Sequence, residues 1–599
     1  MSQKIVSTDD LSFVLYELLD IERLTRFPRY ADHSRETFDA AIDLALKVGA
    51  EEFVPHNRLC DKEEPQFVDG RVVIRPEVKR ALTVLAETGL MAAGHDYERG
   101  GMQLPAVVSQ TCFAILKGAN VGTSAYASLT MAAANTILAH GTPEQIKRYA
   151  EPMMAGRFFG TMCLTEPQAG SSLADLRTRA EPQPDGTYRL FGNKIFISAG
   201  DHELSENIVH LVLARLPDAP PGVKGISLFI VPKFLVNDDG SLGAHNDVAL
   251  AGLIHKMGYR GTTSTMLNFG EKGGAVGYML GRPNEGLACM FHMMNEARIG
   301  VGMGAVMLGY TGYLHALAYA HERRQGRPFT DRDPTSPPVR LIDHPDIRRM
   351  LLAQKAFVEG GLALCLYGAT LVDEKRFAET EQERTVAGGL LDLLTPILKS
   401  WPSQFCLEAN SLAIQVHGGY GYTREYPVEQ FYRDNRLNPI HEGTHGIQAI
   451  DLLGRKVRMA GGAHYRELVA RIEATIAECR EGPLADNAAA VAAALDDLKQ
   501  ATEALLGFGA SGDANRHLAN ASLYLELFGH VVVAWIWLRQ AQAAQRGLEH
   551  GGPRGEAFYR GKLQTCDYFC RYELPKVRPQ ARLLIAGDTT TLTMAPEWF

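Results

Sequence analysis

A β-rich block between two long helical blocks is the feature that most constrains the fold of this sequence. Residues 161–280 hold short runs of β-branched and aromatic residues, such as 208–214 and 226–232, which glycine, proline and aspartate separate. Helical periodicity dominates before this block, for example over residues 39–48, and returns after residue 281. A chain of 599 residues is also long enough for several domains. The pattern predicts an α+β protein with helical domains on both sides of a β-domain.

Two short motifs predict how helices begin and pack. Thr142 and Pro143 read as the N-cap and first position of a helix, so the helical segment should be broken there. Gly300, Gly302 and Gly304 could suggest a dinucleotide-binding turn, but a helical run precedes them and no ribose-binding acid is evident. We therefore expect these small residues to let two helices pack closely.

Residues 415–448 carry the strongest sign of a chemical function. Their glycine cluster would let the backbone approach a bulky ligand. A carboxylate, Glu442, then stands between His441 and Gly443 after a proline-punctuated segment. Partial burial of an acid in such a turn raises its pKa toward neutrality, which suits a base that removes a proton from carbon. Taken alone, the pattern also fits a solvated or helix-capping glutamate, because acids mostly lie on the surface.

The same stretch resembles the C-terminal signature of the acyl-CoA dehydrogenases. That signature runs Q-[IV]-x-G-G-x-G-[FY], then E-Y-P-V-E, R-D and I-Y-E-G-T, and its elements appear here in order and at the family spacing. The departure is His441, where the family usually has tyrosine, beside the expected base. The resemblance implies that Glu442 removes the α-proton of an acyl-CoA while the β-hydrogen leaves as hydride to N5 of FAD. The departure bears on the shape of the acyl pocket.

Four further segments resemble the same family. Residues 163–172 are similar to C-[LIVM]-[ST]-E-P-x-A-G-S-D, with serine for the final aspartate, and residues 192–198 to G-x-K-x-[WF]-I-[ST]. Residues 295–298 match [DN]-x-x-R, and residues 319–325 match Y-A-x-E-R-x-x with glutamine where threonine is usual. Taken alone, these segments also fit a capped turn, a buried strand and two solvated helix faces.

The resemblance implies a role for each matching position. The residues expected to contact FAD are Leu164, Thr165, Phe196, Ser198, Arg323, Gln325, Gln415, Gly418, Gly419 and Thr444. The residues expected to contact the acyl-CoA are Ser171, Asn295, Arg298, His441 and Gly443. Arg323 would reach the FAD pyrophosphate of a neighbouring subunit, which suits a guanidinium because it forks onto two oxygens.

The resemblance also implies the fold, which is an N-terminal helical domain, a central β-barrel and a C-terminal four-helix bundle, with FAD between barrel and bundle. The extra length is similar to that of the large bacterial acyl-CoA dehydrogenases, which include broad-chain fatty-acyl and 3-methylmercaptopropionyl-CoA enzymes. The expected segments are an N-terminal helical extension (1–40), the N-terminal α domain (41–160), the barrel (161–280), the bundle (281–460) with a proline-rich loop insert (327–344), and an additional helical C-terminal domain (461–599).

Composition excludes several other classes. The net charge of −8 gives no sign of attraction to nucleic acid, and no apolar run reaches the roughly 18 residues of a membrane span. The N-terminal residues lack the apolar core of a signal peptide. The nine cysteines are scattered apart from Cys566 and Cys570, so we expect no metal site, reduced thiols and a cytoplasmic protein.

Two alternatives from other classes remain. An acyl-CoA oxidase shares the core and carries extra helical C-terminal mass, but it reduces oxygen. A DNA-binding flavoprotein of the alkylation-response type would need a basic C-terminal domain, whereas residues 465–599 hold 14 Lys and Arg against 16 Asp and Glu. We predict the dehydrogenase, with an acyl-CoA substrate of open chain length, non-covalent FAD, an electron-transfer flavoprotein as acceptor and a homodimer as the assembly.

Overall fold

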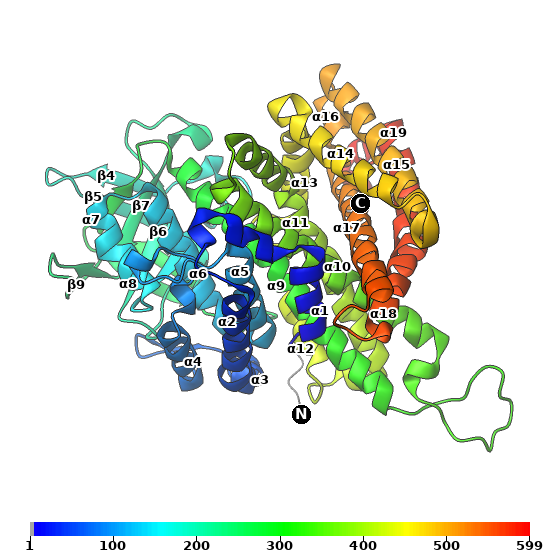
Figure 1. Cartoon of the computed structure of the whole chain (residues 1–599). Coiled ribbons are helices and arrows are strands. Elements are labelled where there is room, and N and C mark those ends of the chain that lie inside the picture. Colours follow the sequence, from blue (N-terminus) through cyan, green and yellow to red (C-terminus); the bar gives the residue numbers. More distant parts are fainter. Residues whose placement is uncertain (1–4) are drawn as a thin grey trace. The chain divides into compact units, whose positions relative to one another are not determined.

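The chain folds into two compact units in a computed structural model (Figure 1), which describes residues 5–599 apart from the side chains of His292, Met294, Asn295 and Glu296. Unit 1 comprises residues 35–300, and unit 2 comprises residues 5–34 together with 301–599. The N-terminal segment therefore belongs to the same unit as the C-terminal helices, a partition that the sequence did not indicate.

Unit 1 begins with helices, as the periodicity predicts. They are α2 (Arg35–Val48), α3 (Val54–Lys62), α4 (Pro76–Glu87), α5 (Ala106–Ala119), α6 (Val121–His140), α7 (Pro143–Gln145) and α8 (Glu151–Met154). The expected helix start at Thr142 is confirmed. Its side chain accepts from the N–H of Gln145 while the Gln145 side chain accepts from the N–H of Thr142, and Pro143 takes the first helical position.

The N-terminal helical part also contains one β-element that the sequence analysis did not predict. A hairpin of β1 (Gln66–Val68) and β2 (Arg71–Val73) interrupts the helices. Asp69 and Gly70 form its turn with φ values of 50° and 79°. Asp-Gly is the dipeptide that two-residue hairpin turns prefer, because both central residues need positive φ. This signal was present in the sequence, but strands of three residues are too short to show a period.

An eight-stranded, barrel-like sheet fills the rest of unit 1. Its strands are β3 (Phe158–Cys163), β4 (Arg179–Pro182), β5 (Tyr188–Ser198), β6 (Asn207–Arg215), β7 (Ile226–Pro232), β10 (Val248–Leu253), β11 (Ser264–Phe269) and β12 (Ala275–Leu280). They lie in the order β10-β11-β5-β12-β7-β6-β3, with β4 beside β5 and β6, and β8 (Phe234–Val236) and β9 (Leu242–His245) form a separate hairpin. The strands predicted at residues 208–214 and 226–232 are confirmed.

The long strand β5 organises this sheet. Its first half pairs with β4 and β12, and its second half pairs with β11. One strand thus serves two parts of the sheet, which encloses a single apolar core. Buried side chains of that core include Val212, Phe229 and Leu267. Every residue of β7 is buried, which explains why it reads as a continuous apolar run with no alternation.

Unit 2 is helical among its described residues. Helix α9 (Gly286–Glu322) begins in unit 1 and ends in unit 2. The other helices of unit 2 are α1 (Thr8–Ser12), α10 (Pro345–Phe377), α11 (Glu381–His417), α12 (Val428–Asn435), α13 (His445–Gly454), α14 (Ala463–Glu478), α15 (Ala485–Ala510), α16 (Ala514–Leu518), α17 (Ala521–His550), α18 (Glu556–Tyr568), α19 (Val577–Ala586) and α20 (Thr590–Thr593). The expected loop over 327–344 is irregular apart from an isolated β-bridge between Arg340 and Arg324 and a short 3-10 turn, Leu341–Asp343.

Of the predicted glycines, Gly302 of α9 serves close helix packing, as expected, whereas a Cβ atom at Gly300 would lie 3.0 Å from Nζ of Lys117. Gly309, outside the predicted motif, packs in the same way as Gly302. A Cβ atom at Gly302 would lie 1.9 Å from the carbonyl oxygen of Leu398 in α11. A Cβ atom at Gly309 would lie 2.9 Å from the carbonyl oxygen of Cys406, two turns further along α11. Glycine is therefore required at these positions because the two helices touch at the backbone.

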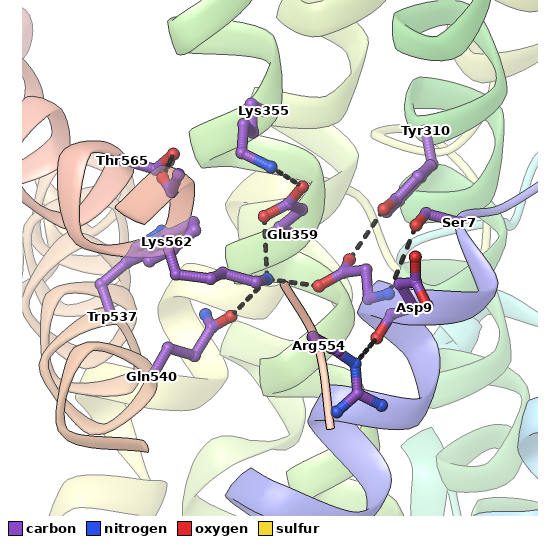
Figure 2. Close-up of polar contacts among 12 residues, drawn as sticks. Ser7, Asp9, Tyr310, Lys355, Glu359, Trp537, Gln540, Arg554, Lys562 and Thr565 are labelled. Atoms are coloured by element: carbon purple, nitrogen blue, oxygen red, sulfur yellow. Dashed lines mark hydrogen bonds and ion pairs between the residues drawn. The ribbon is translucent and has the colours of Figure 1, made fainter. Parts of the chain in front are cut away.

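A buried ionic cluster ties the N-terminal segment to the rest of unit 2 (Figure 2). Lys562 of α18, which has no exposed side-chain surface, pairs with Asp10 of α1 and with Glu359 of α10. Lys355, one helical turn before Glu359, pairs with that carboxylate from the other side. Two buried carboxylates thus face two lysines, so the cluster is balanced in charge.

Two helices of unit 2, α10 and α17, are long and apolar enough to cross a membrane. The most apolar windows of these helices are 94% and 83% buried in the structure, respectively. Core helices pass the same test of length and composition, so this is weak evidence for a membrane span. No group of three or more His, Cys, Asp or Glu side chains within the described residues is placed to hold a metal ion.

Candidate active site

Glu442 lies in the turn that joins α12 to α13, residues 436–444, in unit 2. Its φ of 56° places a non-glycine residue in the left-handed region. That conformation costs an L-residue about 1–2 kcal/mol, and it persists only where the surrounding structure supports it. Gly443 follows with a φ of 93°. The half-buried Glu442 thus occupies a strained turn, a feature that is common at functional sites.

Side chains from two helices hold the backbone of this turn. Lys399 of α11, which is fully buried, donates from Nζ to the carbonyl oxygens of Asn438 at 2.7 Å and Gly443 at 2.8 Å. Gln448 of α13 donates from Nε2 to the carbonyl oxygen of Glu442 at 3.2 Å. The φ of 93° favours glycine at position 443, and a Cβ atom there would lie 2.4 Å from that Nε2 atom and displace the amide.

The residues that flank this turn have structural roles of their own. Thr444 caps α13, because its hydroxyl accepts from the N–H of Ile447 at 3.4 Å. His441 lies with Nε2 3.1 Å from Oδ1 of Asn438. Burial and the nearby Lys399 ammonium lower the pKa of His445 to about 4, so this imidazole is neutral at neutral pH.

Unit 2 also brings together Arg323 and Gln325, just after α9, with the segment that follows α11. The guanidinium of Arg323 donates to Oε1 of Gln325 at 3.5 Å and lies 5.8 Å from the ring centroid of Tyr420. Both side chains are exposed. Two of the expected cofactor motifs, far apart in the sequence, therefore share one exposed surface of unit 2.

The glycine pair at the end of α11 leaves open space. Gly418 has a φ of 61°, and a Cβ atom added at Gly418 or Gly419 would meet no described heavy atom within 4 Å. The positive φ at the C-cap of α11 accounts for Gly418, and the open space beside both glycines leaves room for a ligand. Gln415, in the last turn of α11, is also exposed.

Unit 1 holds the expected flavin turn around a buried ion pair. Glu166 accepts from Nζ of Lys194 at 2.9 Å, from the N–H of Thr178 at 3.0 Å and from the N–H of Arg177 at 2.7 Å. Burial by itself would raise the pKa of Glu166, but the Lys194 ammonium and the hydrogen bonds outweigh it and lower the pKa to about 2. Glu166 is therefore a permanently charged structural residue, unsuited to act as a base near neutral pH.

This ion pair joins the two expected flavin segments of unit 1. Lys194 also donates to the carbonyl oxygen of Leu164 at 3.0 Å, and the N–H of Ile195 donates to the carbonyl oxygen of Thr165 at 2.9 Å. The turn after β3 therefore lies directly beside the second half of β5. Leu164 and Thr165 are half-buried there.

Phe196 is the most unusual residue of this surface. Its side chain is 62% exposed, and its φ of 59° is a rare value for a bulky residue. The positive φ coincides with a register shift between β5 and β11, which turns the aromatic ring outward and makes it available for contact with a ligand. Ser198, two residues along the same strand, is half-buried.

The three expected acyl-CoA contacts of unit 1 are placed differently. Ser171 is exposed in the turn after β3. Arg298 is only 6% exposed, with its guanidinium 5.8 Å from the ring centroid of Phe291. Asn295 lies outside the described side chains.

Sequence reasoning missed Lys399, Asn438 and Gln448, which hold the turn of Glu442. One signal could have found Lys399, because it follows a leucine-rich stretch, 390–398, inside a helix. Lysine is almost never fully buried unless it is paired, so such a position suggests a specific partner. Asn438 and Gln448 carry no comparable signal.

Four family models match the chain in sequence order. They are the acyl-CoA dehydrogenase N-terminal domain over residues 36–157, the acyl-CoA dehydrogenase middle domain over 161–271, the acyl-CoA dehydrogenase C-terminal domain over 284–457, and the acetyl-CoA dehydrogenase C-terminal-like family over 468–595.

Known proteins resemble the chain over nearly its full length. A 3-methylmercaptopropionyl-CoA dehydrogenase of Ruegeria pomeroyi is 37% identical, with 97% of this chain and 98% of that protein covered. A butyryl-CoA dehydrogenase of Syntrophomonas wolfei is 35% identical, with 98% of each covered. The crystal structure of an acyl-CoA dehydrogenase of Bacillus anthracis, complexed with FAD, aligns with a TM-score of 0.75 at 20% identity, and the alignment covers 94% of this chain and 90% of that one.

The helical N-terminal part, the central sheet and the C-terminal helical parts match the fold of that acyl-CoA dehydrogenase structure. The chain belongs to the acyl-CoA dehydrogenase family, whose members use FAD. The fold class expected from the sequence, including the additional helical C-terminal domain, is confirmed.

Proposed function

We propose that the chain converts an acyl-CoA thioester to the trans-2-enoyl-CoA, with Glu442 as the base that removes the α-proton. The observation that supports this proposal is the left-handed backbone of Glu442, in a turn whose carbonyl oxygens accept hydrogen bonds from Lys399 and Gln448. A strained acid with a fixed backbone is suited to a single, defined approach to a substrate. Bound FAD would supply the acceptor for the β-hydride.

The chain must also make a weak carbon acid reactive. A solvated carboxylate near its ordinary pKa is too weak a base for the α-proton of a thioester. Exclusion of water by the bound substrate raises the pKa of the Glu442 carboxyl, and hydrogen bonds to the thioester oxygen stabilise the charge that develops there. We assign one of those donors to the backbone N–H of Glu442, by resemblance to the family.

The residues present fit the cofactor. The exposed ring of Phe196, with Leu164, Thr165 and Ser198 of the same unit, is suited to a flavin ring. In unit 2, the exposed guanidinium of Arg323 is suited to a diphosphate, and the open space beside Gly418 and Gly419 leaves room for the cofactor. The other proposed FAD contacts of unit 2 are Gln325, Gln415 and Thr444. Ser171, Asn295, Arg298, His441 and Gly443 are the proposed acyl-CoA contacts.

We propose a short acyl chain as the substrate. The two relatives above are named for a butyryl and a methylmercaptopropionyl thioester, whose acyl groups are similar in size. Ala133 of α6 is fully buried, and a Cβ atom at Gly160 of β3 would lie 2.6 Å from its Cβ. The small side chain at position 133 therefore serves helix-to-strand packing and gives no argument for a long acyl slot.

A panel of acyl-CoAs from butyryl to palmitoyl, with 3-methylmercaptopropionyl-CoA included, tests the reaction and the chain length. We expect anaerobic bleaching of the flavin with every substrate that is turned over, and the highest kcat/KM at the short end. A long-chain optimum would overturn the substrate proposal. Acyl-dependent hydrogen peroxide in air, at the rate seen with an artificial acceptor, would favour the oxidase alternative over an electron-transfer flavoprotein as acceptor.

We propose a homodimer, because exposed Arg323 and the open glycines after α11 suit a cofactor held by a neighbouring subunit. We also propose a cytoplasmic location, as the scattered cysteines suggest. We expect light scattering to show a dimer. Arg323→Ala should lose FAD on gel filtration, because a diphosphate contact is removed, whereas Arg324→Ala, the adjacent exposed arginine, should keep it. A monomer fully loaded with FAD would contradict the proposal.

A further inference from the structure

The strained turn of Glu442 needs support from outside itself. Glu442 and Gly443 both have positive φ, and such a backbone is held only where other contacts over-determine it. Three carbonyl groups of the turn accept hydrogen bonds from side chains, those of Asn438, Glu442 and Gly443. The donors come from α11, which precedes the turn, and α13, which follows it.

Lys399 spans the turn from one side to the other. Its Nζ bonds to a carbonyl four residues before Glu442 and to the carbonyl immediately after it. The side chain has no exposed surface, so water cannot replace these bonds. Hydrogen bonds from a charged donor are stronger than neutral ones, and a single ammonium that draws two carbonyls together fixes the length of the turn between them.

A chain of three buried asparagines holds the same turn through a side chain. Asn438 donates from Nδ2 to Oδ1 of Asn435 at 2.8 Å, and Asn435 donates to Oδ1 of Asn410 at 2.7 Å. Asn410 donates to the carbonyl oxygen of Leu308 in α9 at 2.9 Å. All three side chains are completely buried, so their amide groups depend on one another and on the carbonyl oxygens of Ala305 and Leu308 for hydrogen bonds.

The direction of these hydrogen bonds determines which nitrogen of His441 carries a hydrogen. The donors run in one direction, from Asn438 to Asn435, from Asn435 to Asn410, and from Asn410 to the Leu308 carbonyl of α9. Oδ1 of Asn438 is therefore an acceptor, and His441 Nε2, at 3.1 Å, must carry the hydrogen. The imidazole that replaces the usual tyrosine thus has one tautomer and one ring orientation directly beside Glu442.

We propose that Lys399 and the chain of Asn410, Asn435 and Asn438 are positioning residues that together fix the orientation of Glu442 and His441. The inference rests on the proposed role of Glu442 as the base. Lys399 bonds to the main chain of the turn, and the chain of asparagines bonds to the side chain of His441 through Asn438. Neither group needs to touch the substrate, so their loss should slow proton removal much more than it weakens acyl-CoA binding.

Lys399→Met tests the main-chain half of the proposal. It keeps the length of the side chain and removes its donors. The limiting rate of anaerobic flavin bleaching should fall by about 10²-fold, the size of effect expected when a reacting group shifts by about 1 Å. FAD content and the acyl-CoA concentration at half-maximal rate should stay within a few-fold of the wild type. An unchanged limiting rate would overturn the inference.

Lys456→Met is the matched control. Lys456 also lies in unit 2, is 4% exposed, and has Nζ 3.5 Å from Asp392, away from the turn of Glu442. It should lower the stability of the protein and leave the limiting bleaching rate unchanged. An equal fall in rate for both variants would show that general loosening of unit 2, and not the turn, is responsible, which also overturns the inference.

A pair of variants at position 441 decides the matter even if Lys399→Met does not fold. His441→Gln keeps an N–H that can reach Asn438, whereas His441→Leu removes it. We expect the glutamine variant to retain a limiting rate at least about 10-fold higher than that of the leucine variant. Equal rates would overturn the role of the asparagine chain. Glu442→Gln is measured alongside. If it bleaches normally, the proposed role of Glu442 as the base fails, whereas an inactive Glu442→Gln with a normal Lys399→Met overturns only this inference.

Discussion

Glu442→Gln is expected to lower turnover by at least about 10³-fold, at the upper part of the range for loss of a general base. The change keeps the shape of the side chain and removes its basicity. FAD content and acyl-CoA binding should stay near normal, because the backbone of the turn bonds to Lys399 and Gln448 through carbonyl groups that the variant retains. The measurement is anaerobic flavin bleaching by acyl-CoA, followed in a stopped-flow instrument.

Two further variants make that result specific. Glu442→Asp retains a carboxylate at shorter reach and should be faster than the glutamine variant. Glu166→Gln removes a buried acid of another expected motif, whose bonds to Lys194 and the Thr178 N–H mark it as structural. That variant should lose stability, while its correctly folded fraction still bleaches. Normal bleaching by Glu442→Gln would move the base to another residue.

Lys562→Met is expected to destabilise unit 2 by about 3–5 kcal/mol, the usual cost of removing one partner from a buried ion pair. Burial and the nearby Glu359 raise the pKa of Asp10, while the Lys562 ammonium opposes them. Without that ammonium, two buried carboxylates would share only Lys355. The measurement is the free energy of unfolding from urea titrations, with the N-terminal segment followed by limited proteolysis.

A double variant supplies the control for this prediction. Lys562→Met with Asp10→Asn removes both charges and leaves the Lys355–Glu359 pair intact. Tyr310, which donates to Asp10 at 2.7 Å, can still donate to the amide oxygen. The double variant should therefore recover much of the lost stability, as a coupled pair does in a double-mutant cycle. A loss below about 1 kcal/mol in Lys562→Met would refute a stabilising role for the buried cluster.

Much of the local structure followed from neighbouring residues. Thr142 and Pro143 define a helix start because capping depends on three or four consecutive residues. The run 226–232 forms a fully buried strand, which its shortness, its β-branched and aromatic residues and the glycine and proline at its ends favour over a helix. The hairpin at Asp69 was equally local, and its Asp-Gly turn was overlooked because the strands beside it are very short.

In the candidate site, too, some features could be predicted from the sequence and others could not. Glu442, Arg323 and the glycines after α11 stand in family motifs, so their identity was available from the order and spacing of residues. The left-handed φ of Phe196 and of Glu442 could not be predicted from the sequence, because surrounding contacts impose the strain and the residue type does not indicate it.

The sequence by itself therefore determined the family, the order of helical and β segments and the identity of the acid proposed as the base, because motifs and periodicity are local. Only the tertiary structure decided that Lys399 lies against the carbonyl of Asn438, 39 residues away, and that Asp10 pairs with Lys562, 552 residues away. Such pairs form when packing excludes water and leaves each buried polar group only the partner that the fold supplies.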